Sequence, residues 1–195
     1  MTVDRLLRPA LAAVLFSACG AQAAPVCRPA ANLDVPADGE GLYVNFVTGV
    51  SARSEGQVPG FDLDVYAMQA SNPEGQMKFY WGPSTNPGAG VVTSGDTYAV
   101  LAEGDTVGPA STFSRAAAGG VTAAWQAGVT GFLGTRFRHE GNGGAVVYGW
   151  VRLATQPPLG FPATIVDWCY EDSGAAIVIS SPDPLFADGF EVPPP

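Results

Sequence analysis

The chain has 195 residues, of which 47% are hydrophobic, and its 9 basic and 18 acidic side chains give a net charge of −9. This acidity disfavours nucleic acid as a partner, because binding to a phosphate backbone requires a basic face. The 25 glycines and 17 prolines, without a long stretch of helical periodicity, favour short strands joined by turns.

The first 23 residues have the order of a secretory signal peptide. Arg5 and Arg8 precede an apolar stretch over 11–18, and Ala21 and Ala23 form an A-x-A cleavage site. The apolar stretch is too short to cross a bilayer, which requires about 20 residues. We therefore expect cleavage after Ala23 and a secreted, periplasmic or cell-surface protein.

The same leader contains a second signal, FSAC, which resembles a bacterial lipobox that ends at Cys19. Ser17 and Ala18 fit that motif, whereas Phe16 stands where leucine is usual. Under this alternative the chain is a lipoprotein anchored through Cys19. Removal of the leader leaves about 172 residues, enough for one domain with a core, and a net charge near −10. No later apolar run is long enough for a membrane helix.

Short apolar-alternating runs separated by turn residues are typical of an all-β fold. We predict one antiparallel two-sheet β-sandwich, jelly-roll-like, over residues 24–181, with a short helix candidate at 111–119. The predicted strands cover 42–48, 61–67, 77–81, 97–102, 132–139, 146–154, 163–171 and 175–180.

The strands at 132–139 and 146–154, joined by EGNGG, predict a β-hairpin, because glycine and asparagine tolerate the turn conformation. Alternation places apolar side chains on one face of this hairpin. The other face carries three arginines and two aromatic residues: Arg136, Arg138, Tyr148, Trp150 and Arg152. Arginine planes stack on aromatic rings in purely structural sheets, but the same residues also suit a ligand-binding face. Burial of Trp150 favours packing, and its exposure favours binding.

The segment 131–172 resembles the conserved half of a β-sandwich domain found in secreted bacterial proteins, many of which carry PEP-CTERM-type sorting tails. The pattern is G-x-R-F, then Y-G-W-hydrophobic-R, then A-x-hydrophobic-hydrophobic-D-aromatic-x-Y-E. It is matched by Gly134, Arg136, Phe137, Tyr148, Gly149, Trp150, Arg152, Ala163, Asp167, Tyr170 and Glu171. The resemblance implies a sandwich fold and no established catalytic residues. This chain departs from that family by lacking an apolar anchor helix and a terminal arginine cluster.

Residues 182–195 contain five prolines, which cannot join a sheet interior, so we expect a flexible tail. Phe186 and Phe190 flank Asp188, which suits docking to another protein. The stretch DPLFADGFE resembles a short ending seen on exported proteins of Gram-negative bacteria.

Catalytic and metal-binding patterns are sparse. His139 is the sole histidine, sits at the hairpin tip and has no G-x-S-x-G partner, so we expect a polar strand end. Asp62 and Asp64 alternate on one strand, a spacing compatible with the two carboxylates of a glycoside hydrolase. Zinc is disfavoured by the shortage of His and Cys.

Calcium, which prefers oxygen ligands, is the one metal that the sequence leaves open. Its candidate ligands are Asp34, Asp38 and Glu40, or Asp62 and Asp64. We expect no other cofactor.

The chain has three cysteines, and loss or lipidation of Cys19 leaves Cys27 and Cys169. Because export leads to an oxidising compartment, we predict a disulfide between them. Trp168 and Tyr170 share the apolar face, so Cys169 points away from it. We expect the N-terminal segment to lie across the outside of the sheet.

These patterns predict an exported, non-catalytic β-sandwich with a structural or adhesive role at the cell surface or in the extracellular matrix. A carbohydrate-binding module that uses Tyr148 and Trp150 is the alternative. A glycoside hydrolase is a third, more distant one. Among partners we expect a glycan or a surface protein.

Overall fold

The computed structural model describes residues 24–82, 88–114 and 121–181. The predicted signal peptide with Cys19, and the predicted tail with Phe186 and Phe190, lie outside the described residues. Within them the fold is almost entirely β, which confirms the prediction of an all-β, antiparallel sandwich.

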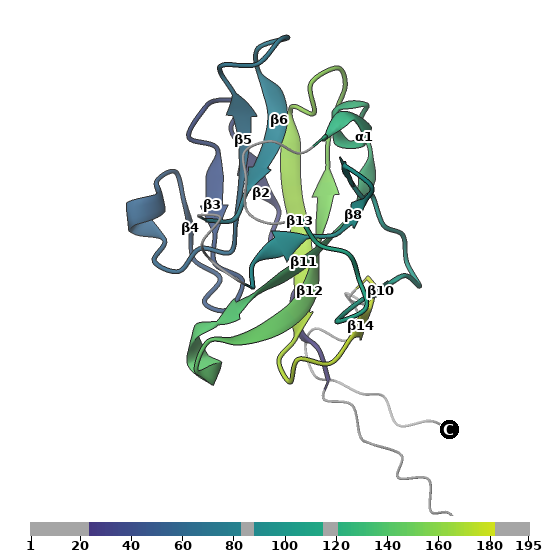
Figure 1. Ribbon diagram of the computed structural model, residues 1–195. Coiled ribbons are helices and arrows are strands. Elements are labelled where there is room, and N and C mark those ends of the chain that lie inside the picture. The colour runs from purple at the N-terminus through teal and green to yellow at the C-terminus, as the bar shows by residue number, and fades with distance from the viewer. Residues whose placement is uncertain (1–23, 83–87, 115–120, 182–195) are drawn as a thin grey trace, which may run out of the picture.

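Two antiparallel sheets form the body of the molecule (Figure 1). The larger sheet has the order β1-β13-β12-β11-β7, and β2 also pairs with β13. Its strands are β1 (Val26–Arg28), β2 (Leu33–Val35), β7 (Gly90–Val91), β11 (Thr130–His139), β12 (Ala145–Ala154) and β13 (Ala163–Glu171). The smaller sheet has the order β4-β3-β5-β6. Its strands are β3 (Leu42–Val44), β4 (Ser51–Ala52), β5 (Leu63–Met68) and β6 (Gln76–Tyr80).

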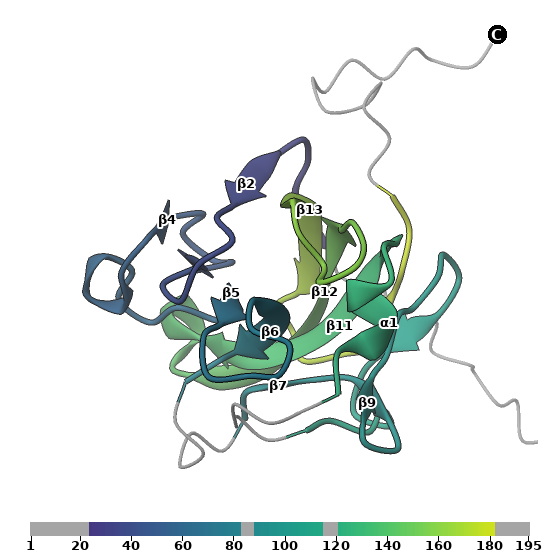
Figure 2. The same cartoon turned by 90° about the horizontal axis from the view of Figure 1, so that it is seen from above.

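In the described part of the chain, two short strand pairs and three helical turns accompany the two sheets. The pairs are β8 (Thr93–Ser94) with β9 (Thr97–Tyr98), and β10 (Thr106–Val107) with β14 (Ile177–Val178). The helical turns are α1 (Ala123–Gln126), η1 (Glu55–Gln57) and η2 (Glu140–Asn142). In the view from above, α1 lies against β9, away from β2 and β4 (Figure 2).

The main core fills the space between the two sheets. Strand alternation directs Val44, Leu63 and Phe79 of the smaller sheet toward Leu133 and Ile165 of the larger one, and all five are at most 1% exposed. Burial of one such side chain contributes about 1.5–3 kcal/mol. The alternating apolar positions seen in the sequence therefore account for the sandwich.

A second, smaller core covers the opposite face of the larger sheet. Its buried residues are Val92, Val107, Phe132, Trp150, Cys169, Ile177 and Ile179. They come from β11, β12 and β13 on one side and from β10, β14 and the segment after β7 on the other. The larger sheet is thus covered on both faces, whereas the hairpin pattern suggested one apolar face.

Two glycines allow the close approaches that this layering requires. A Cβ at Gly134 would lie 2.6 Å from the Val92 side chain and 2.9 Å from Leu101. A Cβ at Gly149 would lie 2.6 Å from the Cys169 carbonyl oxygen. The glycines of the G-x-R-F and Y-G-W motifs are therefore explained by packing.

The long strands predicted at 132–139, 146–154 and 163–171 are confirmed, and the ends of the observed strands differ from the predicted ends by at most two residues. The strand predicted at 42–48 is shorter, because the buried Asn45 side chain begins a turn by accepting the Thr48 N–H. The helix candidate 111–119 is wrong in its described part: Phe113 forms a β-bridge with Val92. Residues 115–119 lie outside the described residues.

The predicted disulfide joins Cys27 and Cys169, whose Cα atoms are 4.1 Å apart. The expected course of the N-terminal segment is wrong, however. β1 pairs with β13 as an edge strand, with Cys27 directly opposite Cys169. The free edge of β13 offers backbone hydrogen bonds to this segment, which the outside of the sheet does not.

Candidate functional site

The predicted hairpin face is largely occupied by packing within the protein. Trp150 is 1% exposed and meets Phe132 edge-on at 5.1 Å between ring centroids. The Arg136 guanidinium lies 4.7 Å from the centroid of the Phe113 ring, which also packs against Tyr148. Trp150 is thus a core residue and presents no ring face to a ligand.

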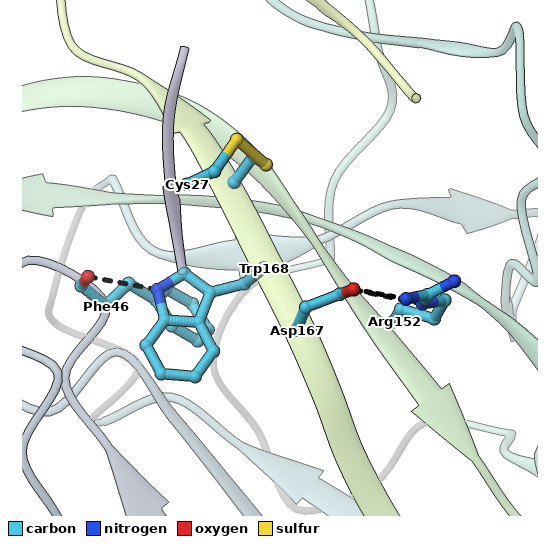
Figure 3. Close-up of a disulfide and its surroundings, with 6 residues drawn as sticks. Cys27, Phe46, Arg152, Asp167 and Trp168 are labelled. Carbon is cyan, nitrogen blue, oxygen red and sulfur yellow. Dashed lines mark hydrogen bonds and ion pairs between the residues drawn. A yellow bond between two sulfur atoms is a disulfide. The ribbon is translucent and has the colours of Figure 1, made fainter. Parts of the chain in front are cut away.

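The other two arginines of this face also have partners. Arg152 donates from Nε to Asp167 at 3.0 Å and from Nη1 to Ser181, on the side of β13 opposite Trp168 (Figure 3). Arg138 is exposed and donates to the Gly144 carbonyl at 3.0 Å. The five predicted binding residues therefore each contact other parts of the protein, and they do not form one common binding site.

A different group of aromatic residues lies on the outward face of the smaller sheet. Asp64 on β5 stands opposite Tyr43 on β3 and Tyr80 on β6. Residues opposite one another in antiparallel strands share a face, and the neighbouring Val44 and Leu63 point into the core. Tyr43, Asp64 and Tyr80 therefore point away from the core.

Phe61, just before β5, joins the two tyrosines into a row. Its ring meets Tyr43 edge-on at 4.9 Å and Tyr80 at 5.6 Å between centroids. All three rings are half-buried. We call Tyr43, Phe61 and Tyr80 the aromatic stripe.

Asp64 lies within this group but is only 2% exposed. Its Oδ1 atom is buried and has no hydrogen-bond partner among the described residues. Burial raises the pKa of Asp64 to about 8, and the charges of Glu40 and Glu55 act in the same direction. The carboxyl group is therefore mostly protonated at neutral pH, so it can both donate and accept a hydrogen bond.

Burial and nearby acids also keep the tyrosine hydroxyls of the stripe protonated. Burial, followed by the charges of Asp64, Glu55 and Glu40, raises the pKa of Tyr43 to about 12. Burial, followed by the charges of Glu55 and Asp64, also raises the pKa of Tyr80. The stripe thus offers two phenolic hydroxyls on a row of three aromatic rings, with the neutral carboxyl of Asp64 buried among them.

An open pocket of about 420 Å³ adjoins the stripe at Phe61. Its lining residues are Glu55, Gly56, Val58, Pro59, Gly60, Phe61, Trp81 and Gly82. Trp81 is 1% exposed, and its indole N–H has no acceptor among the described residues. This N–H is itself buried, so Trp81 forms the floor of the pocket and is not an exposed donor.

Asp62 and Asp64 occupy different environments although they are two residues apart. Asp62 accepts the Phe46 N–H at 2.7 Å, and its pKa is raised well above the ordinary value by burial and by Glu140. The pKa of Asp64 is raised by burial and by the charges of Glu40 and Glu55. Both carboxyls thus have a backbone partner, Phe46 for Asp62 and Leu42 for Asp64, but only Asp64 has a buried oxygen without one among the described residues.

Asp38, one of the predicted calcium ligands, uses its carboxyl group to stabilise a turn. Asp38 Oδ1 accepts the N–H groups of Glu40 and Gly41, both at 3.1 Å, while Oδ2 pairs with Arg53. Asp34 accepts from the Thr164 hydroxyl at 3.4 Å. Among the residues that the structure describes, no group of three or more potential ligands could hold a metal ion.

His139 ends β11 and is half-buried against Tyr170, with 5.6 Å between the ring centroids. The next residue, Glu140, accepts from the buried Asn45 amide at 2.7 Å, which ties the hairpin tip to the smaller sheet. In this setting the sole histidine acts as a packing residue at the end of a strand.

The aromatic stripe was not predicted as a site from the sequence. Part of its signal lies in LYVNF and MKFYW, where Tyr43 and Tyr80 alternate with core residues, but Phe61 lies just before its strand and does not follow that alternation. That alternation alone does not show which sheet face remains uncovered.

Comparison with known protein families, curated proteins and solved structures gave no match. Over the described part of the chain, no helix is both long and apolar enough to cross a membrane.

Proposed function

We propose that this chain is an exported, non-catalytic domain that binds a neutral carbohydrate through the aromatic stripe and Asp64. Its role is then adhesive, at the cell surface or in the extracellular matrix. The observation that carries the proposal is the row of half-buried rings around a buried carboxyl oxygen without a partner.

The stripe has the two features that a sugar requires. The C–H faces of a sugar ring are apolar and pack against aromatic rings, while its hydroxyls need donors and acceptors placed beside them. Tyr43 and Tyr80 supply both features, and the buried Asp64 lies opposite both of them, where its protonated carboxyl can support their hydroxyls. A half-buried aromatic row of this kind on an outward sheet face favours a binding role.

Charge around the stripe supports a neutral ligand over an anionic one. Glu40 and Glu55 are exposed, and both act on the pKa of Asp64 and Tyr43. An acidic glycan would be repelled by these groups, since like charges across a binding face oppose association.

The export part of the proposal rests on the leader and on the cysteine pair. The A-x-A site at Ala21–Ala23 follows an apolar stretch, as in cleaved signal peptides. A disulfide such as Cys27–Cys169 persists in oxidising compartments and is rare in the cytosol.

A glycan array probed with the exported protein tests the function. We expect binding to neutral glycans, and we expect Tyr43→Ala and Tyr80→Ala each to weaken it at least about tenfold, because truncating a hot-spot aromatic residue costs about 2 kcal/mol or more and tenfold is about 1.4 kcal/mol.

Tyr148→Ala is the matched control, because Tyr148 is also half-buried but lies on the hairpin. Melting temperatures show that each variant is folded. Absence of glycan binding by the folded protein would reject the proposal. Loss of binding in Tyr148→Ala alone would move the site to the hairpin.

A further inference from the structure

A second pocket, of about 350 Å³, lies where the start of the described chain meets its end. Its lining residues are Ala24, Pro25, Glu171, Ala176, Ile177, Val178 and Ser180. Figure 1 shows the purple N-terminal strand at the same end of the molecule as the yellow C-terminal segment. Glu171 is the one residue of this lining with a charged side chain.

Glu171 is only partly satisfied, although it is 3% exposed. Its Oε2 atom accepts the Ser173 N–H at 3.1 Å, the Ser173 hydroxyl at 2.9 Å and the Ala175 N–H at 2.7 Å. Its Oε1 atom is buried without a partner among the described residues. A buried polar atom without a hydrogen-bond partner is costly, so a cation or a hydrogen-bond donor at this oxygen would stabilise the fold.

The strand register brings the predicted cleavage site to this oxygen. Val26 stands opposite Tyr170 on β13. Continued by one residue, this register would place Pro25 opposite Glu171, and Ala24, Pro25 and Glu171 do line the same pocket; the Cβ atoms of opposite residues are about 4.5–5.5 Å apart. A glutamate side chain can reach from there to the backbone nitrogen of Ala24.

We propose that cleavage after Ala23 creates the missing partner: the new α-ammonium group of Ala24 pairs with Glu171 Oε1 in this pocket. Hydrolysis of the Ala23–Ala24 peptide bond consumes one water and leaves a carboxylate on Ala23 and an amine on Ala24. That amine takes up a proton at neutral pH, because the pKa of an α-amino group is about 7.7–8.0.

In the precursor the same nitrogen is a neutral amide, so the ion pair forms only after processing. The mature fold is thereby stabilised relative to the precursor at the edge of the larger sheet. This inference rests on the proposed export and on cleavage after Ala23. Lipidation at Cys19 would instead place the N-terminus five residues earlier and leave Ala24 without a charge.

The first test measures the pKa of the Ala24 amine. The protein is exported with its own leader, its N-terminus is identified by mass spectrometry, and its amines are ¹³C-methylated for NMR titration. The sequence contains one lysine, Lys78, so two signals are expected and Lys78 is the internal reference. We expect the α-amine pKa to be raised by about one pH unit through the adjacent carboxylate.

Glu171→Gln should return that pKa to its ordinary range, since the glutamine carbonyl can keep the turn hydrogen bonds but carries no charge. Asp172→Asn is the matched control: Asp172 is the next acid along the chain but does not line the pocket, and the pKa should stay raised. An α-amine that titrates at its ordinary value in the wild type would overturn the ion pair.

A second variant moves the α-ammonium group and leaves Glu171 unchanged. Insertion of Gly-Ser between Ala23 and Ala24 keeps export and the disulfide but shifts the ammonium by two residues. We expect it to lower the melting temperature by roughly 2–4 °C, as Glu171→Gln does, and the two changes together to lower it no further. Additive losses would contradict the pairing.

The outcomes separate this inference from the proposed function. A mature N-terminus other than Ala24 would overturn the inference at its cleavage step. A start at Ala24 with an ordinary α-amine pKa would overturn the ion pair and leave export standing. Glycan binding should be unchanged in Glu171→Gln, because the aromatic stripe lies on the other sheet.

Discussion

Arg152 and Asp167 stand opposite each other on β12 and β13 and form a two-pronged ion pair, with Nε on Oδ1 and Nη2 on Oδ2. Asp167 is 2% exposed, and its pKa is raised by burial while Arg152 acts against that rise. The arginine also reaches Ser181 at 3.2 Å, so it ties the last described residue to the sheet.

Arg152→Met should therefore destabilise the protein by about 3–5 kcal/mol, because it leaves a buried carboxylate without its partner. Chemical denaturation measures the loss. Arg152→Met combined with Asp167→Leu is the control, since replacing both partners by apolar groups should restore most of the stability. A double variant as unstable as the single one would show that the ion pair itself is required.

Asp64→Asn should stabilise the protein increasingly as the pH rises from 5 to 8. The pKa of Asp64 is raised to about 8 in the folded state, against about 3.9 when unfolded. A raised pKa favours folding fully below the unfolded value, and that contribution is lost as the pH rises through the folded value.

Melting curves of the wild type and Asp64→Asn at pH 5, 6, 7, 8 and 9 check this prediction. The difference in melting temperature should widen with pH and level off above about pH 8. Asp62, whose pKa is also raised, is present in both proteins and cancels in the comparison. A constant difference across this range would mean that Asp64 ionises normally in the fold.

Trp150→Ala should cost about 3–5 kcal/mol, because it empties a fully enclosed site against Phe132. Unfolding in urea measures this loss. Tyr148→Ala, two residues earlier on the same face but half-buried, should cost clearly less. A loss below about 1 kcal/mol for Trp150→Ala would contradict its place in the core.

The sequence predicted the central hairpin because alternation over ten residues leaves one consistent register. Leu133, Phe137, Val147 and Val151 face the main core as expected. What covers Trp150 could not be predicted, since β10 and β14 are two-residue strands from distant segments. Such short pairs leave almost no periodic signal and are fixed by tertiary packing.

The candidate site was missed for a related reason. Its aromatic residues lie on three strands whose order in the sheet, β3-β5-β6, is set by tertiary pairing. Alternation placed Tyr43 and Tyr80 on the face of their strands that points away from the core. It could not show that no other segment packs over this face, whereas β10 and β14 pack over the face that carries Trp150. The pairing of Cys27 with Cys169, in contrast, followed from the cysteine count together with the expected export and loss of Cys19.

Removal of the Cys27–Cys169 disulfide should be among the most costly changes in the protein. The bond spans 142 residues, and the chain-entropy account gives roughly 5 kcal/mol for such a loop, with about 2–4 kcal/mol usual in practice. β1 is only three residues long and exposed, so it depends on this bond to stay paired with β13. Cys27→Ala/Cys169→Ala should accordingly lower the free energy of unfolding by about 2–4 kcal/mol and expose the β1 amides to hydrogen exchange.

Iodoacetamide treatment of the exported protein, denatured without reductant, checks the bond directly. Neither cysteine should take up label until reductant is added. Lys78→Ala provides a reference for hydrogen exchange. Lys78 is half-buried on β6 of the smaller sheet, so this substitution should leave the β1 amides protected. Labelling of both cysteines before reduction would show two free thiols, and β1 would then be held by its backbone hydrogen bonds alone.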